Sequence, residues 1–286
     1  MTLRSEISTP EGKRRYVRRL FATIADRYDF ITRVLSYGQD QRWKRRLIEL
    51  ANIGPDDRVL DLACGTGDIV GMAARRARSG IGLDVTLRML QLAAERRRPE
   101  FRTANAEPPE GGTSPASGRR ASARSRRSLG DGANQERGTR VCFVCGDMLA
   151  LPFAGGHFDV VTIGYGLRNV PDLRAAVQEI HRVLVPSGRV LSLDFNRPEN
   201  RLVRTVYLVY LTVVGSMLGG ALHGDPDTYR YIPESMRNYP GARGVTRLFE
   251  QHGFADVRVV PVLGGLMSIH VAKKESGITK QDSGLG

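Results

Sequence analysis

The chain has 286 residues, and its 43 Lys and Arg against 30 Asp and Glu give a formal net charge of +13. The length and the 41% of hydrophobic residues are ordinary for a soluble globular protein with a full core, while three cysteines cannot form a disulfide framework and leave a zinc site short of ligands. We expect the thiols to be buried and reduced in a cytoplasmic protein, and the charge to favour an anionic partner such as a nucleic acid, an acidic membrane or a polyanionic ligand.

The first 52 residues predict a helical segment. The opening sequence MTLRSEISTPEGKRR lacks the apolar core of a secretory signal. Beyond it, apolar residues recur at three- and four-residue steps, which is typical of helices that bury one face; they are Tyr16, Leu20, Ile24, Ile31, Val34, Leu35, Trp43, Leu47 and Leu50. Arginine-rich runs between them form either an ordinary solvated face or a surface attracted to anionic lipid. We predict that residues 1–52 cover the functional site of the domain that follows.

From residue 58 onward, short strands alternate with helices. The predicted strands are residues 58–63, 80–85, 140–147, 158–167, 188–196, 255–263 and 265–274. The predicted helices between them are residues 68–77, 86–98, 173–185 and 244–254. Such alternation is typical of a parallel sheet with helices on both faces, and two closing strands with a short connection predict an antiparallel edge. We therefore predict an α/β domain over residues 53–275.

Two segments interrupt this alternation. Residues 103–140 are rich in Gly, Ser, Pro and Arg and cannot bury enough apolar surface to offset the entropy of ordering. We predict a disordered insertion there, and a flexible tail over residues 276–286. Residues 202–222 are apolar over nearly the length of a membrane span, but they lie between two strands of one domain. We therefore interpret residues 202–240 as an apolar lid over the substrate.

The sequence VLDLACGTGD places a glycine turn directly after the first strand, at the sheet edge where ligands of doubly wound folds bind. A dinucleotide fingerprint needs a third glycine at a spacing that is absent here, and a phosphate-binding loop needs a Gly-Lys-Ser/Thr that is also absent. What remains is Asp61, Gly65 and Gly67, followed by Asp84 and Asp147 at the ends of the next two strands. These acids can meet an ammonium, two ribose hydroxyls and an adenine amine, which predicts S-adenosylmethionine.

Longer stretches resemble a known family, the demethylmenaquinone and ubiquinone C-methyltransferases. These stretches are FATIADRYDFITRVLSYGQDQRWKRR, VLDLACGTGD, LPFAGGHFDVVTIGYGLRNVPD, RVLVPSGRVLSLDFNRP and YRYIPESMRNYP. The resemblance runs from Phe21 to Lys273 and is broken only by the insertion. It implies the class I methyltransferase Rossmann-like fold, with a mostly parallel seven-stranded sheet, an antiparallel edge strand and N-terminal helices. It also implies S-adenosylmethionine as the methyl donor, no metal, and a polyprenyl quinol as the acceptor.

The same resemblance extends the set of cofactor contacts. The family's contacts fall on Thr66, Asp84, Asp147, Met148 and Gly164. The family commonly has Asn-Ala where this chain has Asp147 and Met148. An acid still accepts a hydrogen bond from an adenine amine, so this departure alters only the detail of that contact.

Methylation of a quinol ring carbon requires a base, or a cation that stabilises the phenolate, because a free phenol has a pKa of about 10. Arg168 and Asn169 follow the fourth strand, at the same sheet edge as the glycine turn. A guanidinium is a poor base, but Arg168 can orient a water or stabilise the phenolate, and Asn169 can bind the second ring oxygen. The alternatives are a surface arginine and a helix-capping asparagine. Asp29 is the second candidate base, or a helix cap, and Tyr28 closes over the site.

Tyr229 and Tyr231 are the predicted walls of the ring pocket, with simple aromatic packing as the alternative. The favoured acceptor is demethylmenaquinol. The alternatives are the ubiquinone precursor 2-polyprenyl-6-methoxy-1,4-benzoquinol, another lipid, or a small aromatic molecule. RNA binding is disfavoured because the arginine-rich insertion lacks the interleaved aromatic residues that stack on bases. The basic runs and the apolar lid favour peripheral attachment to the inner face of the cytoplasmic membrane, and the sequence leaves a homodimer open.

Overall fold

The computed structural model describes residues 3–104, 140–198 and 200–276. The chain divides into two units, residues 1–95 with 139–286 and residues 96–138, and the first of these contains the sheet. The predicted insertion and the predicted tail fall almost wholly outside the described residues.

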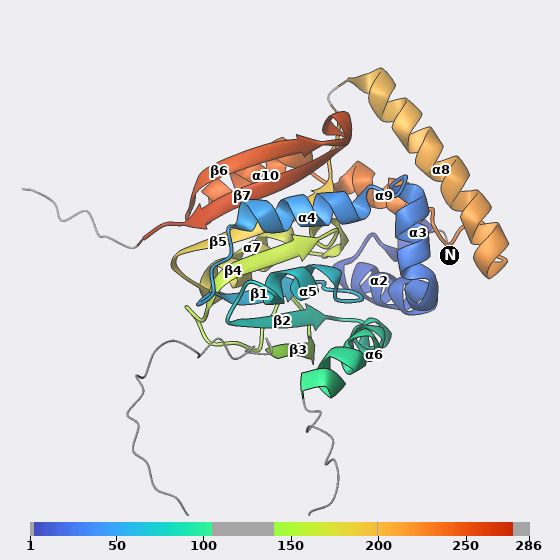
Figure 1. Ribbon diagram of the computed structural model, residues 1–286. Helices are drawn as coiled ribbons and strands as arrows, with labels where there is room; N and C mark the ends of the chain where they lie inside the picture. The colour runs from blue at the N-terminus through green and yellow to red at the C-terminus, as the bar shows by residue number, and fades with distance from the viewer. Residues whose placement is uncertain (1–2, 105–139, 199, 277–286) are drawn as a thin grey trace, which may run out of the picture. The chain divides into compact units, whose positions relative to one another are not determined.

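The first unit is built on a sheet of seven described strands in the order β3-β2-β1-β4-β5-β7-β6 (Figure 1). Their bounds are β1 Arg58–Leu62, β2 Ser79–Asp84, β3 Arg140–Cys145, β4 Phe158–Gly164, β5 Leu184–Phe195, β6 Phe254–Val262 and β7 Met267–Lys274. Strand β7 is antiparallel to both of its neighbours, and every other pair is parallel. The predicted mostly parallel sheet is thereby confirmed, with the antiparallel strand one place in from the edge.

Helices cover both faces of this sheet (Figure 1). Their bounds are α4 Asp40–Ala51, α5 Asp68–Ala74, α7 Leu173–Val183 and α10 Gly241–Glu250, and α6 Leu87–Ala104 begins after β2. Helices α4 and α5 bury Leu47 and Ala73 against one face, and α7 and α10 bury Ile180 and Phe249 against the other. The spacing of the apolar residues therefore determines which side of each helix faces the sheet, because only that side is apolar enough to pack on it.

The N-terminal helices lie at the carboxyl ends of the strands, next to α8 and α9 (Figure 1). Their bounds are α1 Leu3–Glu6, α2 Pro10–Ile24, α3 Tyr28–Leu35, α8 Arg201–His223 and α9 Tyr231–Asn238. The side chain of Thr9 caps the start of α2 by accepting the N–H of Gly12. A separate apolar cluster joins Val17 and Leu20 of α2 to Tyr231. Residues far apart in the sequence thus form one layer over the strand ends.

The predicted lid is one long helix, α8, followed by the shorter α9. Glycines on one side of α8 let the returning chain pack closely, since a Cβ at Gly219 would lie 2.5 Å from the carbonyl oxygen of Asp225. Within the described residues, α8 is the one helix that is long and apolar enough to cross a membrane, and only 22% of its most apolar window is buried. Its exposed apolar residues include Val206, Val213 and Met217.

The expectation of buried thiols is correct for one cysteine and wrong for two. Cys64 is buried in the glycine turn, whereas Cys142 and Cys145 are exposed. Both exposed residues lie on β3, which is an edge strand of the sheet. Val141 of the same strand is buried against Val70 and Ala74 of α5, and Cys142 points to the opposite face, because successive side chains alternate along a strand.

Candidate active site

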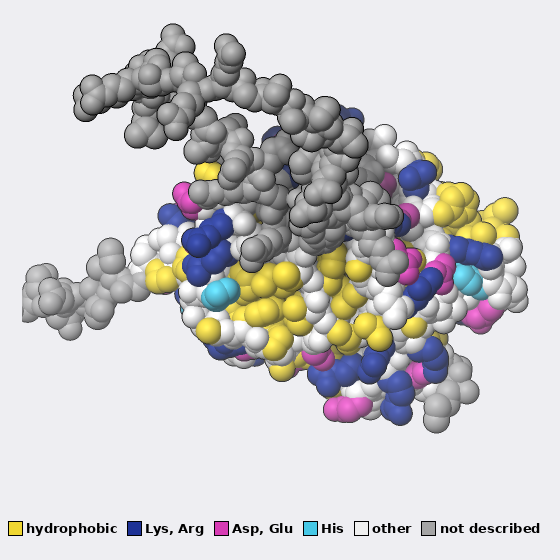
Figure 2. All heavy atoms as spheres, turned by 60° about the horizontal axis from the view of Figure 1, so that its bottom comes forward, with side chains coloured by type: hydrophobic (Ala, Val, Ile, Leu, Met, Phe, Trp, Pro, Cys, Tyr) yellow, Lys and Arg dark blue, Asp and Glu magenta, His cyan; other side chains and the backbone are white. Residues whose placement is uncertain are grey.

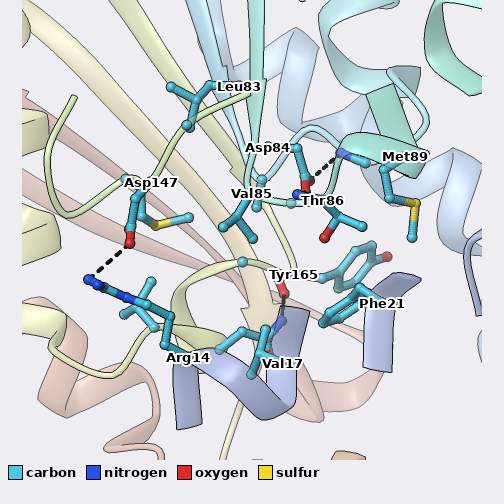
Figure 3. Close-up of a pocket in the computed structure, with 18 of the residues that line it drawn as sticks. Arg14, Val17, Phe21, Leu83, Asp84, Val85, Thr86, Met89, Asp147 and Tyr165 are labelled. Atoms are coloured by element: carbon cyan, nitrogen blue, oxygen red, sulfur yellow. Dashed lines mark hydrogen bonds and ion pairs between the residues drawn. The ribbon is translucent and has the colours of Figure 1, made fainter. Parts of the chain in front are cut away.

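A cavity lies at the carboxyl ends of β1, β2, β3 and β4, next to helix α2 (Figure 3). It encloses about 740 Å³, part of it open to solvent. The sequence-predicted residues that line it are Tyr28, Gly65, Asp84, Asp147, Met148, Gly164 and Asn169. Three strand ends and the turn after β1 therefore bring most of the predicted cofactor residues to one place, as the edge rule for doubly wound sheets predicts.

Asp84 holds the glycine turn against the end of β2. One oxygen of its carboxylate accepts the N–H of Gly65 at 2.9 Å, and the other accepts the N–H of Thr86 at 2.8 Å. Gly65 has a φ of +55°, a conformation that favours glycine. Burial raises the pKa of Asp84, although these backbone hydrogen bonds favour its ionised form. A buried acceptor group thus faces the cavity from a fixed position.

The opposite wall of the cavity is shaped by Gly164 and Asp147. A Cβ at Gly164 would lie 2.4 Å from Cδ1 of Ile69, so a larger residue at this position would have to displace that side chain. Asp147 accepts the N–H of Leu149 at 2.9 Å, and its second oxygen pairs with Arg14 of α2 at 2.9 Å (Figure 3). The carboxylate that we assigned to an adenine amine therefore also holds the N-terminal helix.

The lining of this cavity suits the chemistry of S-adenosylmethionine. Its wall combines the carboxylates of Asp84 and Asp147 with the side-chain oxygen of Asn169, which is buried without a hydrogen-bond partner among the described residues. Among the residues that the structure describes, no three His, Cys, Asp or Glu side chains are grouped closely enough to hold a metal ion. The expectation of metal-free chemistry remains a prediction.

Three predicted cofactor residues lie behind the cavity wall. Asp61 is fully buried and accepts the hydroxyl of Thr162 at 2.7 Å and the N–H of Val70 at 3.2 Å. Burial outweighs these hydrogen bonds and raises the pKa of Asp61 to about 7. Thr66 is also buried, and Gly67, with a φ of +82°, precedes the first residue of α5. All three support the turn from beneath.

A second, more apolar cavity adjoins the first and encloses about 700 Å³, part of it open to solvent. Phe21, Tyr28 and Tyr165 line both cavities. The second cavity is also lined by Arg168 and by the two predicted ring-pocket residues, Tyr229 and Tyr231. Within the described part of the chain, the hydroxyls of Tyr165 and Tyr231 and the Nε of Arg168 are buried without a hydrogen-bond partner. An apolar space with such groups in its wall suits an aromatic ligand that carries oxygens.

Arg168 is a buried cation, not the surface residue of the alternative interpretation. Its Nη1 donates to Asp194 at 2.7 Å and to the carbonyl of Tyr165 at 3.0 Å, and its Cζ lies 4.5 Å from the ring centre of Phe195. Burial opposes the charge and is the largest single effect, but the attraction and the hydrogen bond to Asp194, with Tyr28 and Tyr231, together raise the pKa of Arg168. The guanidinium therefore stays charged at the wall of the apolar cavity.

The remaining catalytic candidates lie around the same opening. Asn169 donates to the carbonyl of Tyr165 at 2.9 Å, and it caps no helix, because Asp172 caps α7. Burial raises the pKa of Tyr28, which lines both cavities. Asp29 accepts the hydroxyl of Thr66 at 2.9 Å and lines neither cavity. The structure thus brings Tyr28 and Asn169 to the cofactor cavity and places Asp29 behind it.

Sequence reasoning missed several residues of this site. Asp194, the counter-ion of Arg168, ends a predicted strand at the same sheet edge, and that position was a usable signal. Lys13, Arg14 and Phe21 come from α2, and no local pattern distinguishes them from the other basic and apolar residues of that helix. Only the packing of α2 over the strand ends shows their place.

Several solved structures with this fold are methyltransferases. A SAM-dependent methyltransferase from Thermotoga maritima matches with a TM-score of 0.53 and 15% identity, over 91% of this chain and 100% of that chain. A phosphoethanolamine N-methyltransferase from Haemonchus contortus, solved with S-adenosylhomocysteine, matches with a TM-score of 0.54 and 13% identity, over 82% of this chain and 52% of that one. These identities show the fold alone. Fold, glycine turn and strand-end carboxylates together define the class I SAM-dependent methyltransferases.

Sequence comparison gives the family within this class. The model of the ubiE/COQ5 methyltransferase family matches residues 9–106 and 125–274. A demethylmenaquinone methyltransferase of Thermus thermophilus is 36% identical over 89% of this chain and 100% of the relative. One of Mycolicibacterium gilvum is 34% identical, over 89% and 93%, and one of Staphylococcus aureus is 30% identical, over 95% and 98%. The chain belongs to the ubiE/COQ5 methyltransferase family and is a SAM-dependent methyltransferase.

Proposed function

We propose that this enzyme transfers a methyl group from S-adenosylmethionine to a ring carbon of demethylmenaquinol, in menaquinone biosynthesis. The observation that carries the proposal is the pair of adjoining cavities, with the charged Arg168 in the wall of the apolar one. The names of the relatives, which cover nearly the whole chain, support the choice of acceptor.

S-adenosylmethionine supplies the electrophilic methyl group. The residues of this chain bind and orient the cofactor and the quinol, and they exclude water from the site. In this proposal Asp84 binds the ribose hydroxyls and Asp147 the adenine amine, while Gly164 contributes backbone to the cavity wall. The apolar cavity holds the quinol ring between Tyr229 and Tyr231, whose burial excludes water. Phe21, Tyr28 and Tyr165 line both cavities, and the proposal places methyl transfer between these rings.

Arg168 is proposed to stabilise the negative charge that develops on the quinol oxygen, because a fixed cation in a dry cavity is most effective where charge appears. Asn169 is proposed to bind the second ring oxygen through its side-chain amide. Tyr28 stays protonated near neutral pH, since its pKa is raised, and so acts as a hydrogen-bond donor. Asp29 remains the second candidate base, and reaches the ring only through Thr66 or a water.

The acceptor is tested by a methyl-transfer assay with purified enzyme. Short-chain demethylmenaquinol, short-chain 2-polyprenyl-6-methoxy-1,4-benzoquinol and bulk RNA are offered side by side with labelled S-adenosylmethionine. We expect turnover on demethylmenaquinol to exceed that on the benzoquinol by at least about tenfold, because the cavity favours the larger apolar ring. RNA should stay unlabelled. Equal or greater turnover on the benzoquinol would favour the ubiquinone precursor instead.

Asp61 provides a pH test of the cofactor site. We propose that its carboxylate attracts the ammonium of the cofactor from beneath the turn. The pKa of Asp61 is raised to about 7, so the attractive ionised form is lost as the pH falls. Affinity for S-adenosylhomocysteine, measured by calorimetry, should fall by up to about tenfold per pH unit below this pKa. Asp61→Asn should flatten the profile, and an unchanged slope in that variant would remove Asp61 from the cofactor set.

We further propose that α8 docks the enzyme on an anionic bilayer, where polyprenyl quinols reside. The helix exposes one apolar face, formed by Leu202, Val203, Val206, Val209, Val213 and Met217. Its opposite face packs on the domain through Gly215 and Gly219, which fits a helix that lies in the interface. The net charge of +13 adds attraction to acidic lipid. In Figure 2 the Lys and Arg side chains of the visible face stand in separate groups, so we expect the apolar helix to contribute most of the binding.

The membrane proposal predicts a specific loss of binding. Val206→Asp with Val213→Asp places two charges on the exposed face of α8 and should reduce co-sedimentation with anionic liposomes by about tenfold or more. Thr205→Asp with Thr212→Asp adds the same charge at exposed polar positions of this helix and should have a much smaller effect. Binding should also weaken with salt. Equal loss in both pairs would contradict docking through this face, and salt-insensitive binding would show that the basic residues contribute nothing to it.

A further inference from the structure

Two adjacent side chains fasten helix α2 across the cofactor cavity. The Nζ of Lys13 donates to the carbonyl oxygen of Val170 at 2.6 Å and to that of Arg168 at 3.1 Å. The next residue, Arg14, pairs with Asp147 at 2.9 Å (Figure 3). These partners lie in the loops that follow β4 and β3. Helix α2 is therefore tied to two different loops, and Val17, one turn further along, lines the cavity between them.

The contacts of Lys13 are unlike those of a surface lysine. The turn that it binds is the short 3-10 helix Leu167–Asn169, whose last carbonyls lack partners within so short a helix. The charged groups that act on Lys13 are Arg168 and Asp194. Burial, together with the nearby Arg168, lowers the pKa of Lys13 to about 8, against the attraction of Asp194. The two hydrogen bonds to carbonyl oxygens hold the Lys13 ammonium in this partly buried site, although burial and Arg168 disfavour its charge.

Of the two bound carbonyls, one belongs to Arg168 and the other to Val170, which directly follows Asn169, so both lie in the segment that the proposed mechanism uses. Arg168 and Asn169 are fixed from one side by the carbonyl of Tyr165, which accepts a hydrogen bond from each. Lys13 fixes the same turn from the other side. An α2 that moved away from the cavity would thus release both the cover of the cofactor and one support of Arg168.

We propose that Lys13 is a positioning residue that fastens α2 over the cofactor cavity and holds the turn of Arg168 and Asn169 in place for methyl transfer. The part that concerns the acceptor rests on the proposed function. The part that concerns the cofactor does not, because any methyl acceptor would meet the same cavity under α2. In this proposal α2 lifts when the cofactor is exchanged, and the hydrogen bonds of Lys13 slow that step.

The test uses Lys13→Met in the full-length enzyme, which keeps the apolar stem of the side chain and removes its donors. We expect the dissociation rate of S-adenosylhomocysteine to rise by about tenfold or more, since hydrogen bonds from a charged group are lost. The kcat should fall by about tenfold, with the KM for the acceptor nearly unchanged. Lys13→Arg keeps the charge and the donors and should restore most of both values. Arg18→Met, at an exposed position of the same helix, should change neither.

A separate measurement on the unmodified enzyme guards against a variant that does not fold. S-adenosylhomocysteine should slow chymotrypsin cleavage within α2, at Tyr16 or Phe21, by about tenfold. If no quinol is methylated, the dissociation rate and the protection still decide the role of Lys13, and only the acceptor proposal fails. A Lys13→Met enzyme that melts earlier but keeps the wild-type dissociation rate and kcat would overturn the proposal, as would equal cleavage of α2 with and without ligand.

Discussion

Arg168→Ala is expected to lower kcat for methyl transfer by about 100-fold or more, while S-adenosylhomocysteine binds within about threefold of its normal affinity. The guanidinium is the buried cation of the acceptor cavity, and its Nε has no partner within the described residues. Its removal takes away the group that we assign to the developing phenolate. Arg168 does not line the cofactor cavity, so the methyl donor should be affected little. Single-turnover kinetics and calorimetry measure the two quantities.

The same substitution also leaves Asp194 without its cation. Asp194 is 3% exposed and pairs with Arg168 at 2.7 Å, and removing one partner of a buried pair costs about 3–5 kcal/mol. The melting temperature of Arg168→Ala should therefore fall by roughly 6–20 °C. Arg168→Met with Asp194→Asn removes both charges and should recover much of this stability without recovering turnover. Recovery of turnover in the double variant would show that Arg168 acts only through the fold.

The sheet and the cofactor turn could be predicted from the sequence because their signals are local. Each strand is marked by its run of apolar residues. In a parallel sheet the carboxyl ends of the strands meet at one edge, so the residues at these ends lie close together. Asp84 and Asp147 were found in this way, and both line the cavity. The position of Arg168 after the fourth strand also predicts a place at this edge, but nothing in the sequence predicts that its side chain is buried. The rule uses only the order of strands and helices, which a single sequence displays.

The rest of the site depends on contacts that no local pattern encodes. Lys13 and Val170 are 157 positions apart in the sequence. Lysine side chains and backbone carbonyls occur throughout the chain, so the residue types alone do not indicate that these two pair. The pairing of Arg168 with Asp194 depends on β4 and β5 being neighbours in the sheet. Such features require the packed chain, since burial and partner choice are decided between elements.

Asp84→Asn is expected to weaken binding of S-adenosylmethionine by about 100-fold. The carboxylate accepts two backbone N–H groups, from Gly65 and Thr86, and in our proposal also the ribose hydroxyls. An asparagine retains one acceptor oxygen and adds donors that face other donors. The loss of hydrogen bonds to a charged group, at about 1.5–3 kcal/mol each, accounts for the expected factor. Calorimetric titration with S-adenosylhomocysteine and the KM for the methyl donor measure it.

The choice of control decides whether this loss reports on the ligand or on the turn. Asp56→Asn removes one exposed carboxylate before β1 and should leave the affinity unchanged. Asp84→Glu keeps the charge but lengthens the side chain, so it should restore the Gly65 contact poorly and the affinity only in part. Decreased affinity for S-adenosylhomocysteine with normal affinity for adenine alone would locate the loss at the ribose. Equal loss for both ligands would instead mean that Asp84 acts by holding Gly65 and the turn, because that turn supports the whole floor of the cavity.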